Sequence, residues 1–480
     1  MALLNFLGAI QQVTGSCYLI ETFDKKNILL ECGMQQGGDS DENNNNNNNG
    51  NGNGNGNRSA FAFNPEHIDA VVISHAHIDH SGMLPRLVSE GFRGPIFATE
   101  ATCELMELML LDSAHIQEKD AEWENRWRAR RGKKAIKPLY VSQDAERVLK
   151  QRKPVSYEKR VEVVPGVHVT FADAGHIIGA AIVKLEFAEP NDSVRTLVFS
   201  GDLGSTCSPL MKTPAILKHA DVLLLESTYG DRDHRCNEET LDELVAILEQ
   251  ADKDGGNVMI PAFSVGRTQD ILFHLGRFYQ EGRLPQHTVY LDSPMAIRAN
   301  DIYFRHREDF DEENRAMLKK HNIHNVSDWL PILKLTPTPE ESMAINDVKS
   351  GAIIVAGSGM CNGGRIVHHF KHNLWRTDCH LIFTGFQARG TTGRAIVDGV
   401  KSVRVFREDI MVGAQVHTLG GFSAHAGQSQ LIEWASHFEN HPELHLIHGE
   451  LDKMLILQSE FKKRLNWDAN IPELGDRIAL

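Results

Sequence analysis

The sequence predicts an α/β protein in which short buried strands alternate with helices. Three apolar runs rich in β-branched residues, 70–73, 258–260 and 352–356, have the length and composition of buried strands. The stretch 241–249 has the spacing of a helix. Polar or glycine-rich segments follow the first and third runs, as in α/β folds whose sites form at the carboxyl ends of parallel strands. Functional residues are therefore expected where strands end.

The strand predicted at 70–73 leads into a loop with the pattern HxHxDH, which contains His75, His77, Asp79 and His80. Imidazole nitrogens and carboxylate oxygens suit zinc and similar ions, and ligands crowded into one loop can be divided between two ions. For a single HxH pair, a solvated loop rich in histidine would be the simpler interpretation. The complete pattern directly after a strand favours a metal site.

Two later strand ends carry one further candidate ligand each. His176 follows a strand-like stretch around Phe171, and Asp202 follows another at 196–199. Alone, either residue would be interpreted as an ordinary hydrogen-bonded histidine or as an aspartate in a turn. Their order after the histidine-rich loop favours one shared metal site.

In this order, the strand-end ligands resemble those of the metallo-β-lactamase superfamily, which implies an αββα sandwich. Three later motifs resemble the β-CASP branch of that superfamily, whose members include nucleases. They are LLLESTYG at 223–230 with Glu226, GFSAHAG at 421–427 with His425, and LIHGE at 446–450 with His448.

Further segments narrow the resemblance within this branch. Residues 260–267, 357–365 and 383–388, together with a histidine at 448, are similar to bacterial and archaeal RNA-processing nucleases related to the pre-mRNA 3′-end cleavage endonuclease. The resemblance extends over nearly the whole chain. It implies that the substrate is RNA, with single strands expected, and a homodimer would follow by analogy.

The resemblance and the ligand types together assign two zinc ions. His75, His77 and His176 would hold one ion, Asp79, His80 and His448 the other, and Asp202 would be shared. Two such ions can clamp the attacking and leaving oxygens of a phosphodiester, and can lower the pKa of a bound water towards about 7. Manganese is the alternative metal, because sites built from His and Asp can hold either ion.

The leaving ribose oxygen also needs a proton. His425 is the candidate donor, since imidazole titrates near neutral pH, and Glu226 would orient its ring. The alternative is that His425 contacts a phosphate without proton transfer. Further phosphate donors are expected in two loops, at Ser264, Arg267, Ser358, Gly359 and Arg365. Glycine-rich runs alone are more often tight turns, so these last assignments depend on the resemblance.

Glu31 departs from the resembling family, which usually has Asp at this position to support the metal ligands. Glu is longer by one methylene, and carboxylates that contact ligands set ligand orientation. The substitution is therefore expected to weaken one metal or to shift its geometry. The other expected ligand positions all hold competent residues.

Composition is compatible with this assignment without requiring it. The chain has 480 residues, 41% of them hydrophobic, and no apolar run long enough to span a bilayer. Its start lacks the basic and apolar regions of a secretory signal, so we expect a cytoplasmic protein. Seven scattered cysteines without a CxxC pair argue against a disulfide framework or a cysteine-ligated zinc.

A net charge of -14 is unusual for a protein that binds nucleic acid, so positive charge must be concentrated locally. Metal ions and the arginines at 267, 365, 389 and 394 are expected to provide it. The basic stretch 126–134, RWRARRGKK, also combines an aromatic residue with cations and could contact RNA. A solvated helix end is the simpler interpretation of this stretch.

The ligands before residue 203 and at 448 must meet, so a domain is inserted between them. We predict a discontinuous metallo-β-lactamase-like domain, 1–230 and 408–480, with an α/β β-CASP cap at 231–407 and a disordered Asn/Gly insertion at 39–57. The expected function is a zinc-dependent ribonuclease, endonucleolytic with 5′-3′ exonuclease action as a second mode. The alternatives are a non-catalytic RNA-binding subunit and a small-molecule metallo-hydrolase.

Overall fold

The computed structural model describes residues 2–36, 56–188, 193–235 and 237–480. Most of the Asn/Gly insertion predicted at 39–57 lies outside these residues. The described chain forms two compact units. Unit 1 comprises Met1–Gly204, Thr213–Asp233 and His425–Leu480, and unit 2 comprises Ser205–Lys212 and His234–Ala424.

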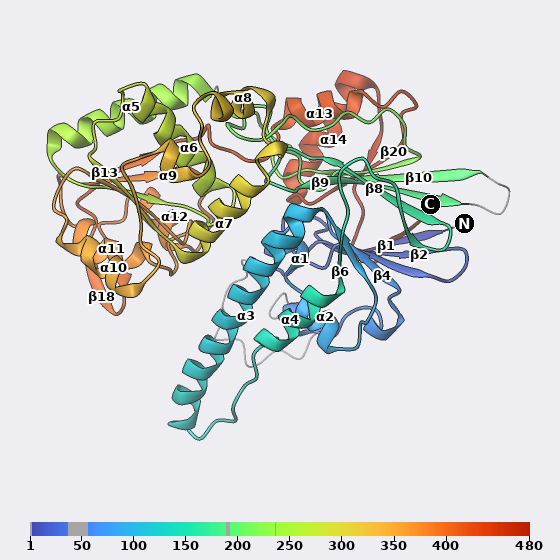
Figure 1. Ribbon diagram of the computed structural model, residues 1–480. Helices are drawn as coiled ribbons and strands as arrows, with labels where there is room; N and C mark the ends of the chain where they lie inside the picture. Colours follow the sequence, from blue (N-terminus) through green and yellow to red (C-terminus); the bar gives the residue numbers. More distant parts are fainter. Residues whose placement is uncertain (1, 37–55, 189–192, 236) are drawn as a thin grey trace. The chain divides into compact units, whose positions relative to one another are not determined.

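Unit 1 contains two seven-stranded sheets (Figure 1). The first sheet has the order β22-β1-β2-β3-β4-β5-β6, and the second β21-β20-β11-β10-β9-β8-β7. The strands of the first sheet are β1 (Leu3–Gly8), β2 (Cys17–Glu21), β3 (Asn27–Leu30), β4 (Ala70–Val72), β5 (Ile96–Ala98), β6 (Arg152–Pro154) and β22 (Arg477–Ala479). Those of the second sheet are β7 (Val161–Val164), β8 (Val167–Asp173), β9 (Ala181–Ala188), β10 (Val194–Phe199), β11 (Val222–Glu226), β20 (Glu443–Ile447) and β21 (Ala469–Asn470).

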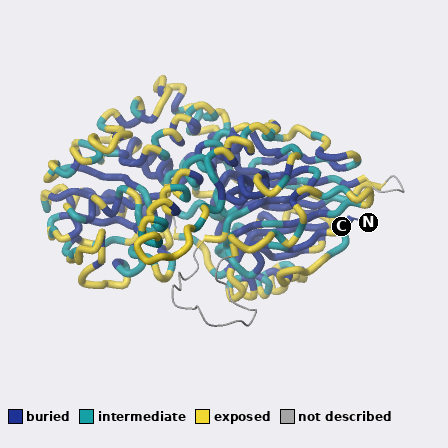
Figure 2. The backbone as a smooth tube through the Cα atoms, turned by 90° about the horizontal axis from the view of Figure 1, so that it is seen from below, coloured by how far each residue is buried: buried dark blue, intermediate teal, exposed yellow. Residues whose placement is uncertain are grey.

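The two sheets of unit 1 share one apolar core. Alternate residues of β8, Val167, Val169 and Phe171, are buried in it, as the two-residue period of a strand requires. Leu4 and Phe6 of β1 belong to the same core from the first sheet. In Figure 2 the strands of this unit are correspondingly dark blue over most of their length.

Helices cover the outer faces of this sandwich (Figure 1). Beside the first sheet lie α1 (Ile78–Ser81), α2 (Leu84–Ser89), α3 (Glu100–Ala129) and α4 (Ser142–Gln151). The short 3-10 turns η1 (Gly56–Arg58) and η2 (Pro65–His67) lie between β3 and β4 in the chain. Beside the second lie α13 (Gln428–Ser436) and α14 (Leu451–Leu465). The predicted αββα sandwich is therefore confirmed.

Unit 2 is built on a six-stranded sheet in which all neighbouring strands are parallel, in the order β14-β13-β15-β12-β16-β19. The strands are β12 (Val258–Pro261), β13 (Thr288–Asp292), β14 (Leu333–Leu335), β15 (Ala352–Ala356), β16 (His380–Phe383) and β19 (Gln415–Thr418). A separate antiparallel pair is formed by β17 (Ser402–Val405) and β18 (Glu408–Met411).

The sheet of unit 2 is buried on both faces. Ile353 and Val355 of β15 belong to one apolar cluster, and Ile354 and Ala356 to another. Such strands have continuous rather than alternating apolar sequences, which explains the run at 352–356. The helices are α5 (Asn237–Asp254), α6 (Arg267–Gln280), α7 (Pro294–Arg305), α8 (Glu312–Lys320), α9 (Val326–Trp329), α10 (Pro339–Ala344), α11 (Ile366–Asn373) and α12 (Thr392–Val397), with 3-10 turns η3 (Arg307–Asp309) and η4 (Ile345–Asp347).

The predicted domain boundaries lie at 230/231 and 407/408, whereas the main changes between the two units of the structure lie at 233/234 and 424/425. Residues 408–424, which the sequence assigns to the first domain, pack within unit 2, where β19 pairs with β16.

None of the helices in the described ranges is long and apolar enough to cross a membrane. Within the same ranges, no disulfide joins the six cysteines.

Candidate metal centre

Every predicted metal ligand lies just beyond a strand of unit 1. His75 and His77 follow β4, with Asp79 and His80 in the short helix α1 directly after them, while His176 follows β8, Asp202 follows β10 and His448 follows β20. Strands β10, β11 and β20 are parallel neighbours, so their carboxyl ends meet at one edge of the sheet. The topology thereby brings ligands from four distant segments to one place.

Glycines let these loops approach each other closely. A Cβ atom at Gly204 would lie 1.9 Å from the carbonyl oxygen of Gly175, so no side chain fits between the loops of Asp202 and His176. At Gly33, a Cβ would lie 1.7 Å from the carbonyl oxygen of Asp79. Both positions therefore require glycine.

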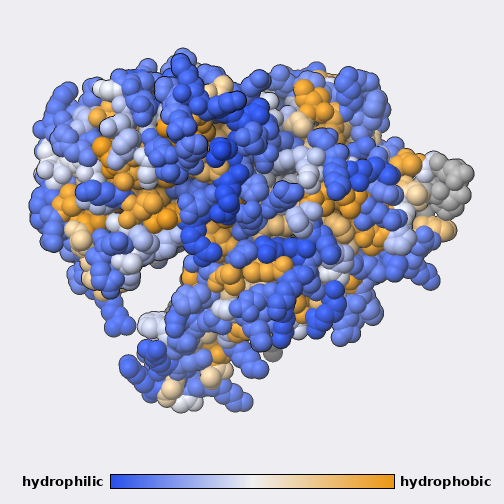
Figure 3. Space-filling model, in the orientation of Figure 1, coloured by the Kyte–Doolittle hydropathy of each residue, from blue (hydrophilic) through white to orange (hydrophobic). Residues whose placement is uncertain are grey.

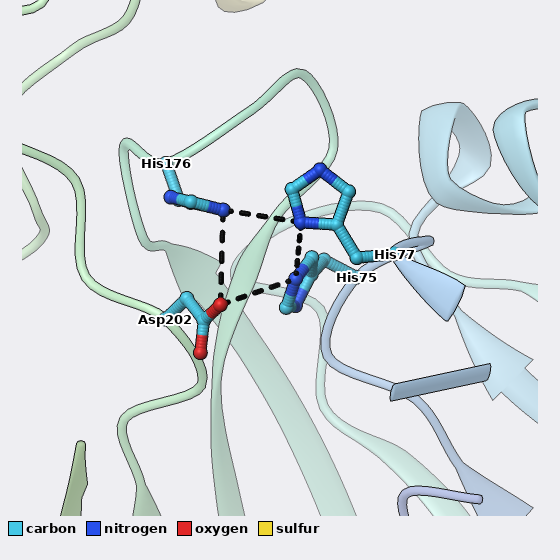
Figure 4. A group of neighbouring side chains, drawn as sticks. All are labelled: His75, His77, His176 and Asp202. Carbon is cyan, nitrogen blue, oxygen red and sulfur yellow. Dashed lines mark hydrogen bonds and ion pairs between the residues drawn. The ribbon is translucent and has the colours of Figure 1, made fainter. Parts of the chain in front are cut away.

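The first group of ligands comprises His75, His77, His176 and Asp202 (Figure 4). Nδ1 of His77 lies 3.1 Å from Nε2 of His75 and 3.3 Å from Nε2 of His176. Oδ2 of Asp202 lies 3.5 Å and 3.7 Å from the same two Nε2 atoms. Ligands at zinc distances around a tetrahedral ion are about 3.3 Å apart, so the four atoms fit a zinc ion among them.

The second group comprises Asp79, His80 and His448. Oδ1 of Asp202, the oxygen that faces away from the first group, lies 3.4 Å from Nε2 of His80 and 3.6 Å from Nδ1 of His448. Oδ2 of Asp79 lies 3.7 Å from Nε2 of His448. Asp202 therefore presents one oxygen to each group, the arrangement expected of a shared ligand.

The hydrogen bonds of this second group support a metal. Nε2 of His80, Oδ1 of Asp202 and Nε2 of His448 are buried, and none makes a well-directed hydrogen bond within the described part of the chain. Buried polar atoms are rarely left so, because each costs free energy. A cation would satisfy all three atoms at once.

Glu31 fixes the loop that carries the first ligands. It is fully buried at the end of β3, and its Oε1 accepts the backbone N–H of Ser74 at 2.6 Å. Its Oε2 lies 2.6 Å from Nδ1 of His80 and 3.1 Å from the Ser74 hydroxyl. A hydrogen bond at Nδ1 leaves Nε2 of His80 as the metal-binding atom.

The charges of the centre favour ligand forms of these side chains. Burial lowers the pKa of His75 well below its usual value, which keeps that imidazole neutral. Burial alone would raise the pKa of Asp202, but the neighbouring His448 and His80 hold it well below the usual range. A neutral imidazole and an ionised carboxylate are the forms that bind a metal.

His425 and Glu226 form a pair beside the first group. Nδ1 of His425 lies 3.3 Å from Oε2 of Glu226, which is buried and accepts the backbone N–H of Leu203 at 2.7 Å through Oε1. Burial would lower the pKa of His425, but the Glu226 carboxylate raises it to about 9. The His425 ring also lies 4.5 Å from that of His176, so this pair adjoins the metal ligands.

Hydrogen bonds also hold His448 in place. Its Nδ1 lies 3.2 Å from the Thr228 hydroxyl, and its backbone N–H donates to the carbonyl oxygen of Ala9 at 2.9 Å. Thr228 and Ser74 were not identified from the sequence. Ser74 directly precedes the ligand His75, and Thr228 lies two residues after Glu226. Their positions within these two motifs were the signal that could have identified them.

The residues predicted to bind phosphate lie in unit 2, at the carboxyl ends of β12 and β15. Ser264 follows β12, and its hydroxyl lies 3.2 Å from that of Ser293, which follows β13. Gly359, after β15, approaches the Phe263 ring so closely that a Cβ would lie 3.0 Å from it. The structure thus groups Ser264 with the loop containing Ser358 and Gly359, while Arg267 begins α6. Their role in phosphate binding stays a prediction.

Arg365 is held by protein groups. One of its terminal nitrogens donates to the Asp292 carboxylate at 2.6 Å and to the carbonyl oxygen of Thr336, and the other to that of Pro337 at 2.9 Å. Asp292 was not identified from the sequence, although it ends a strand as a carboxylate, which was the signal used for Asp202.

The αββα sandwich and its clustered strand-end ligands define a metallo-hydrolase. Comparison with known proteins agrees: residues 11–176 match the metallo-beta-lactamase superfamily, 268–396 the Beta-Casp domain, and 409–472 the Zn-dependent metallo-hydrolase RNA specificity domain. The chain is 37% identical to ribonuclease TTHA0252 of Thermus thermophilus over 452 residues, 94% of each chain. It is 29% identical to transcription termination factor FttA of Methanocaldococcus jannaschii, over 99% of this chain and 71% of that protein.

A solved structure of a protein of unknown function from Enterococcus faecalis matches the whole of both chains with a TM-score of 0.57 and 13% sequence identity, which shows the fold alone. The chain belongs to the β-CASP branch of the metallo-β-lactamase superfamily.

Proposed function

We propose that this protein is a metal-dependent ribonuclease that hydrolyses RNA phosphodiester bonds at a centre of two zinc ions. The observation that carries the proposal is the position of Asp202, whose two oxygens face two separate ligand groups. The relative named a ribonuclease, together with the match to an RNA specificity domain, supports RNA as the substrate.

The ligand set determines what the metals would contribute. His75, His77 and His176 would hold one ion and Asp79, His80 and His448 the other, with Asp202 between them. When bound, the ions supply a nucleophile from water at neutral pH and neutralise charge on the scissile phosphate. Glu31 keeps the His80 ring in its ligand orientation through the 2.6 Å hydrogen bond.

His425 would donate a proton to the leaving ribose oxygen. Glu226 holds the ring through Nδ1 and keeps it protonated, because the pKa of His425 is raised to about 9. The raised pKa keeps the ring protonated at neutral pH, which is the form that a proton donor needs. Glu226 thus serves to orient the donor and to stabilise its charge.

Several finer assignments rest on the sequence. Manganese as the alternative metal, endonucleolytic rather than 5′-3′ exonucleolytic action, a cytoplasmic location and a homodimer all stay predictions.

The test is cleavage of end-labelled single-stranded RNA, and of a DNA of the same sequence, by zinc-loaded protein. Asp202→Ala should reduce cleavage by about 1,000-fold or more, since it removes the ligand common to both groups. The matched control is Asp468→Ala, which removes a carboxylate that is 84% exposed and pairs with Lys462 on the surface.

His425→Ala separates the two roles considered for that residue. Loss of a general acid lowers kcat by about 100-fold or more and removes the fall in rate at high pH, whereas loss of a phosphate contact mainly raises KM. Two bound zinc ions without cleavage of either nucleic acid would contradict the proposed function.

A further inference from the structure

Helix α3 is an arm that begins beside the metal centre. The hydroxyls of Thr99 and Thr102, at its first turn, donate to the carbonyl oxygen of Gly179 at 2.6 Å and 2.8 Å, three residues after the ligand His176. The helix continues for 30 residues, which at 1.5 Å per residue is about 45 Å. Figure 1 shows it extending past α4, with its C-terminal end the part of unit 1 farthest from the sheets.

The end of this arm concentrates positive charge. Six of the nine residues at 126–134 are Arg or Lys, in a chain of net charge -14. Arg128 pairs with Glu124 at 2.9 Å. The other five cations are exposed, and among the described residues none forms a salt bridge with a carboxylate: Arg126, Arg130, Arg131, Lys133 and Lys134. We call residues 123–134 the basic tip.

Neighbouring carboxylates form a salt bridge with only one cation of the basic tip, Arg128, which pairs with Glu124. Glu118 accepts hydrogen bonds from Ser142, Glu122 pairs with Lys119 at 3.2 Å, and Glu124 pairs with Arg128. In Figure 3, hydrophilic residues predominate at the lower end of unit 1, where α3 ends, with a few hydrophobic residues among them. A surface of this kind attracts a polyanion.

The basic tip is folded and held in shape. The Asn125 side chain donates to the carbonyl oxygen of Ile136 at 2.9 Å and accepts the N–H of the same residue at 2.7 Å. Arg128 receives the N–H of Lys133 on its carbonyl oxygen at 3.0 Å and donates to that of Lys134 at 3.2 Å. The cations are therefore presented on a fixed turn, which lowers the entropy cost of binding.

Aromatic rings lie among the cations. The Arg131 guanidinium covers the Trp127 ring at 3.9 Å, and Lys133 lies 5.3 Å from it. Trp123, one turn earlier on the same face, is 62% exposed. Exposed tryptophan and arginine planes are the groups on which unpaired bases stack.

We propose that the basic tip is a second binding site for single-stranded RNA, separate from the metal centre. The proposal rests on the proposed function only in taking RNA as the ligand. A strand stacked at about 3.4 Å per nucleotide needs about 13 nucleotides to cover the length of α3. The tip therefore strengthens binding of long RNAs, and short oligonucleotides bound at the metal centre do not reach it.

The test measures RNA affinity by fluorescence anisotropy, with the full chain carrying Asp202→Ala so that RNA is not cut. In that background, the triple change Arg126→Ala, Arg130→Ala and Lys134→Ala should weaken binding of a 30-nucleotide single strand by about 10-fold at low salt. The slope of log affinity against log salt should fall by about 2, since about 0.7 is lost per phosphate contact. Affinity for an 8-nucleotide strand should not change.

The matched control removes the same charge elsewhere in unit 1, by Lys150→Ala, Lys153→Ala and Lys159→Ala, all at exposed positions. An equal loss in this control, or an equal loss for the 8-nucleotide strand, would overturn the proposal. Trp123→Ala should weaken 30-nucleotide binding by about 10-fold and Trp123→Phe should restore it, because stacking needs only an aromatic face.

Two further outcomes separate the proposals from one another. If the 30-nucleotide strand binds through the tip but the parent protein cleaves no RNA, only the proposed function fails. If RNA is cleaved and the triple variant binds it as the parent does, only the basic tip proposal fails. Polyglutamate that displaces the 30-nucleotide strand as well as unlabelled RNA does would show a general polyanion surface, and would overturn the assignment to RNA.

Discussion

Two aspartates at strand ends, Asp202 in unit 1 and Asp292 in unit 2, differ in what surrounds their oxygens. Asp292 accepts four hydrogen bonds at 2.6–2.8 Å, from Arg365, His369, Ser342 and Thr336, so that each oxygen has two partners. Asp202 is also buried, yet its Oδ1 has no well-directed hydrogen bond in the described residues, and the imidazole nitrogens of His80 and His448 lie 3.4 Å and 3.6 Å from it.

The difference separates a structural carboxylate from a metal ligand. A buried carboxylate with every lone pair satisfied by protein donors has no room for a cation. One whose oxygen has no directed donor and lies among imidazole nitrogens is arranged to bind a cation together with them. Position at a strand end makes an aspartate a candidate functional residue. Its hydrogen-bond partners then show whether it is a metal ligand or a structural carboxylate.

The largest expected effect is on catalysis. Asp202→Asn keeps the shape of the side chain but removes its charge, so both metals bind more weakly and RNA cleavage falls by about 1,000-fold or more. Cleavage and zinc content of the purified protein measure this. Because Asn can still accept hydrogen bonds, thermal unfolding without metal should be unchanged, and a large drop in Tm would mean that Asp202 is structural as well.

The corresponding change in unit 2 should affect stability. Asp292→Ala leaves Arg365 and His369 without their carboxylate, and breaking a buried pair in this way costs about 3–5 kcal/mol of unfolding free energy. Urea denaturation measures the loss, and zinc content should be unchanged. Asp398→Ala, which removes a half-exposed partner of Arg394, is the control and should cost less than about 1 kcal/mol.

A smaller effect is expected at Glu31. Both of its carboxylate oxygens are hydrogen-bonded to Ser74 or His80, so it orients ligands instead of binding a metal. Glu31→Gln keeps the length but weakens the hydrogen bonds to Ser74 and His80, so zinc affinity should fall by about 10- to 100-fold. Competition with a zinc chelator of known affinity measures this change. Unaltered affinity would show that Glu31 does not orient His80.

As the pH falls, the metal centre of unit 1 and the Asp292 cluster of unit 2 should be lost at different pH values. Burial would raise the pKa of Asp292, but its hydrogen bonds from His369, Ser342 and Arg365 lower it to about 2. Because this is below the ordinary value of 3.8, Asp292 stabilises the protein above about pH 4, and the contribution is lost as pH falls towards 2.

Zinc should leave at a higher pH, because an imidazole binds a metal only in its neutral form and protons compete with zinc for the ligand nitrogens before they reach Asp292. Zinc release followed with a chromogenic chelator should therefore precede the loss of near-UV circular dichroism. A single acid transition for both signals would contradict the distinction between the two aspartates.

Much of unit 1 could be predicted because its signals are local. The loop with His75 and His77 follows a strand, and His176 and Asp202 also follow strands, so sequence order alone indicated their meeting point. Glu226 and His425 were found through motifs that resemble a family, and the structure places them within 3.3 Å of each other.

The remaining features depend on contacts between distant segments. The partners of Asp292 come from segments 44–77 residues away, and no local pattern shows that they converge. The packing of residues 408–424 in unit 2 follows from the pairing of β19 with β16, which alternation of apolar residues does not specify. In the basic tip, the sequence showed the cations, but the hydrogen bonds of Asn125 that hold the turn needed the structure.

The central claim is that Asp202 is shared by two metal ions. X-ray diffraction from crystals of zinc-loaded protein, measured on both sides of the zinc absorption edge, tests it most directly. The account predicts two anomalous peaks, one among His75, His77 and His176 and one among Asp79, His80 and His448, with one Asp202 oxygen directed at each. A single peak, or two peaks of which only one contacts Asp202, would contradict it.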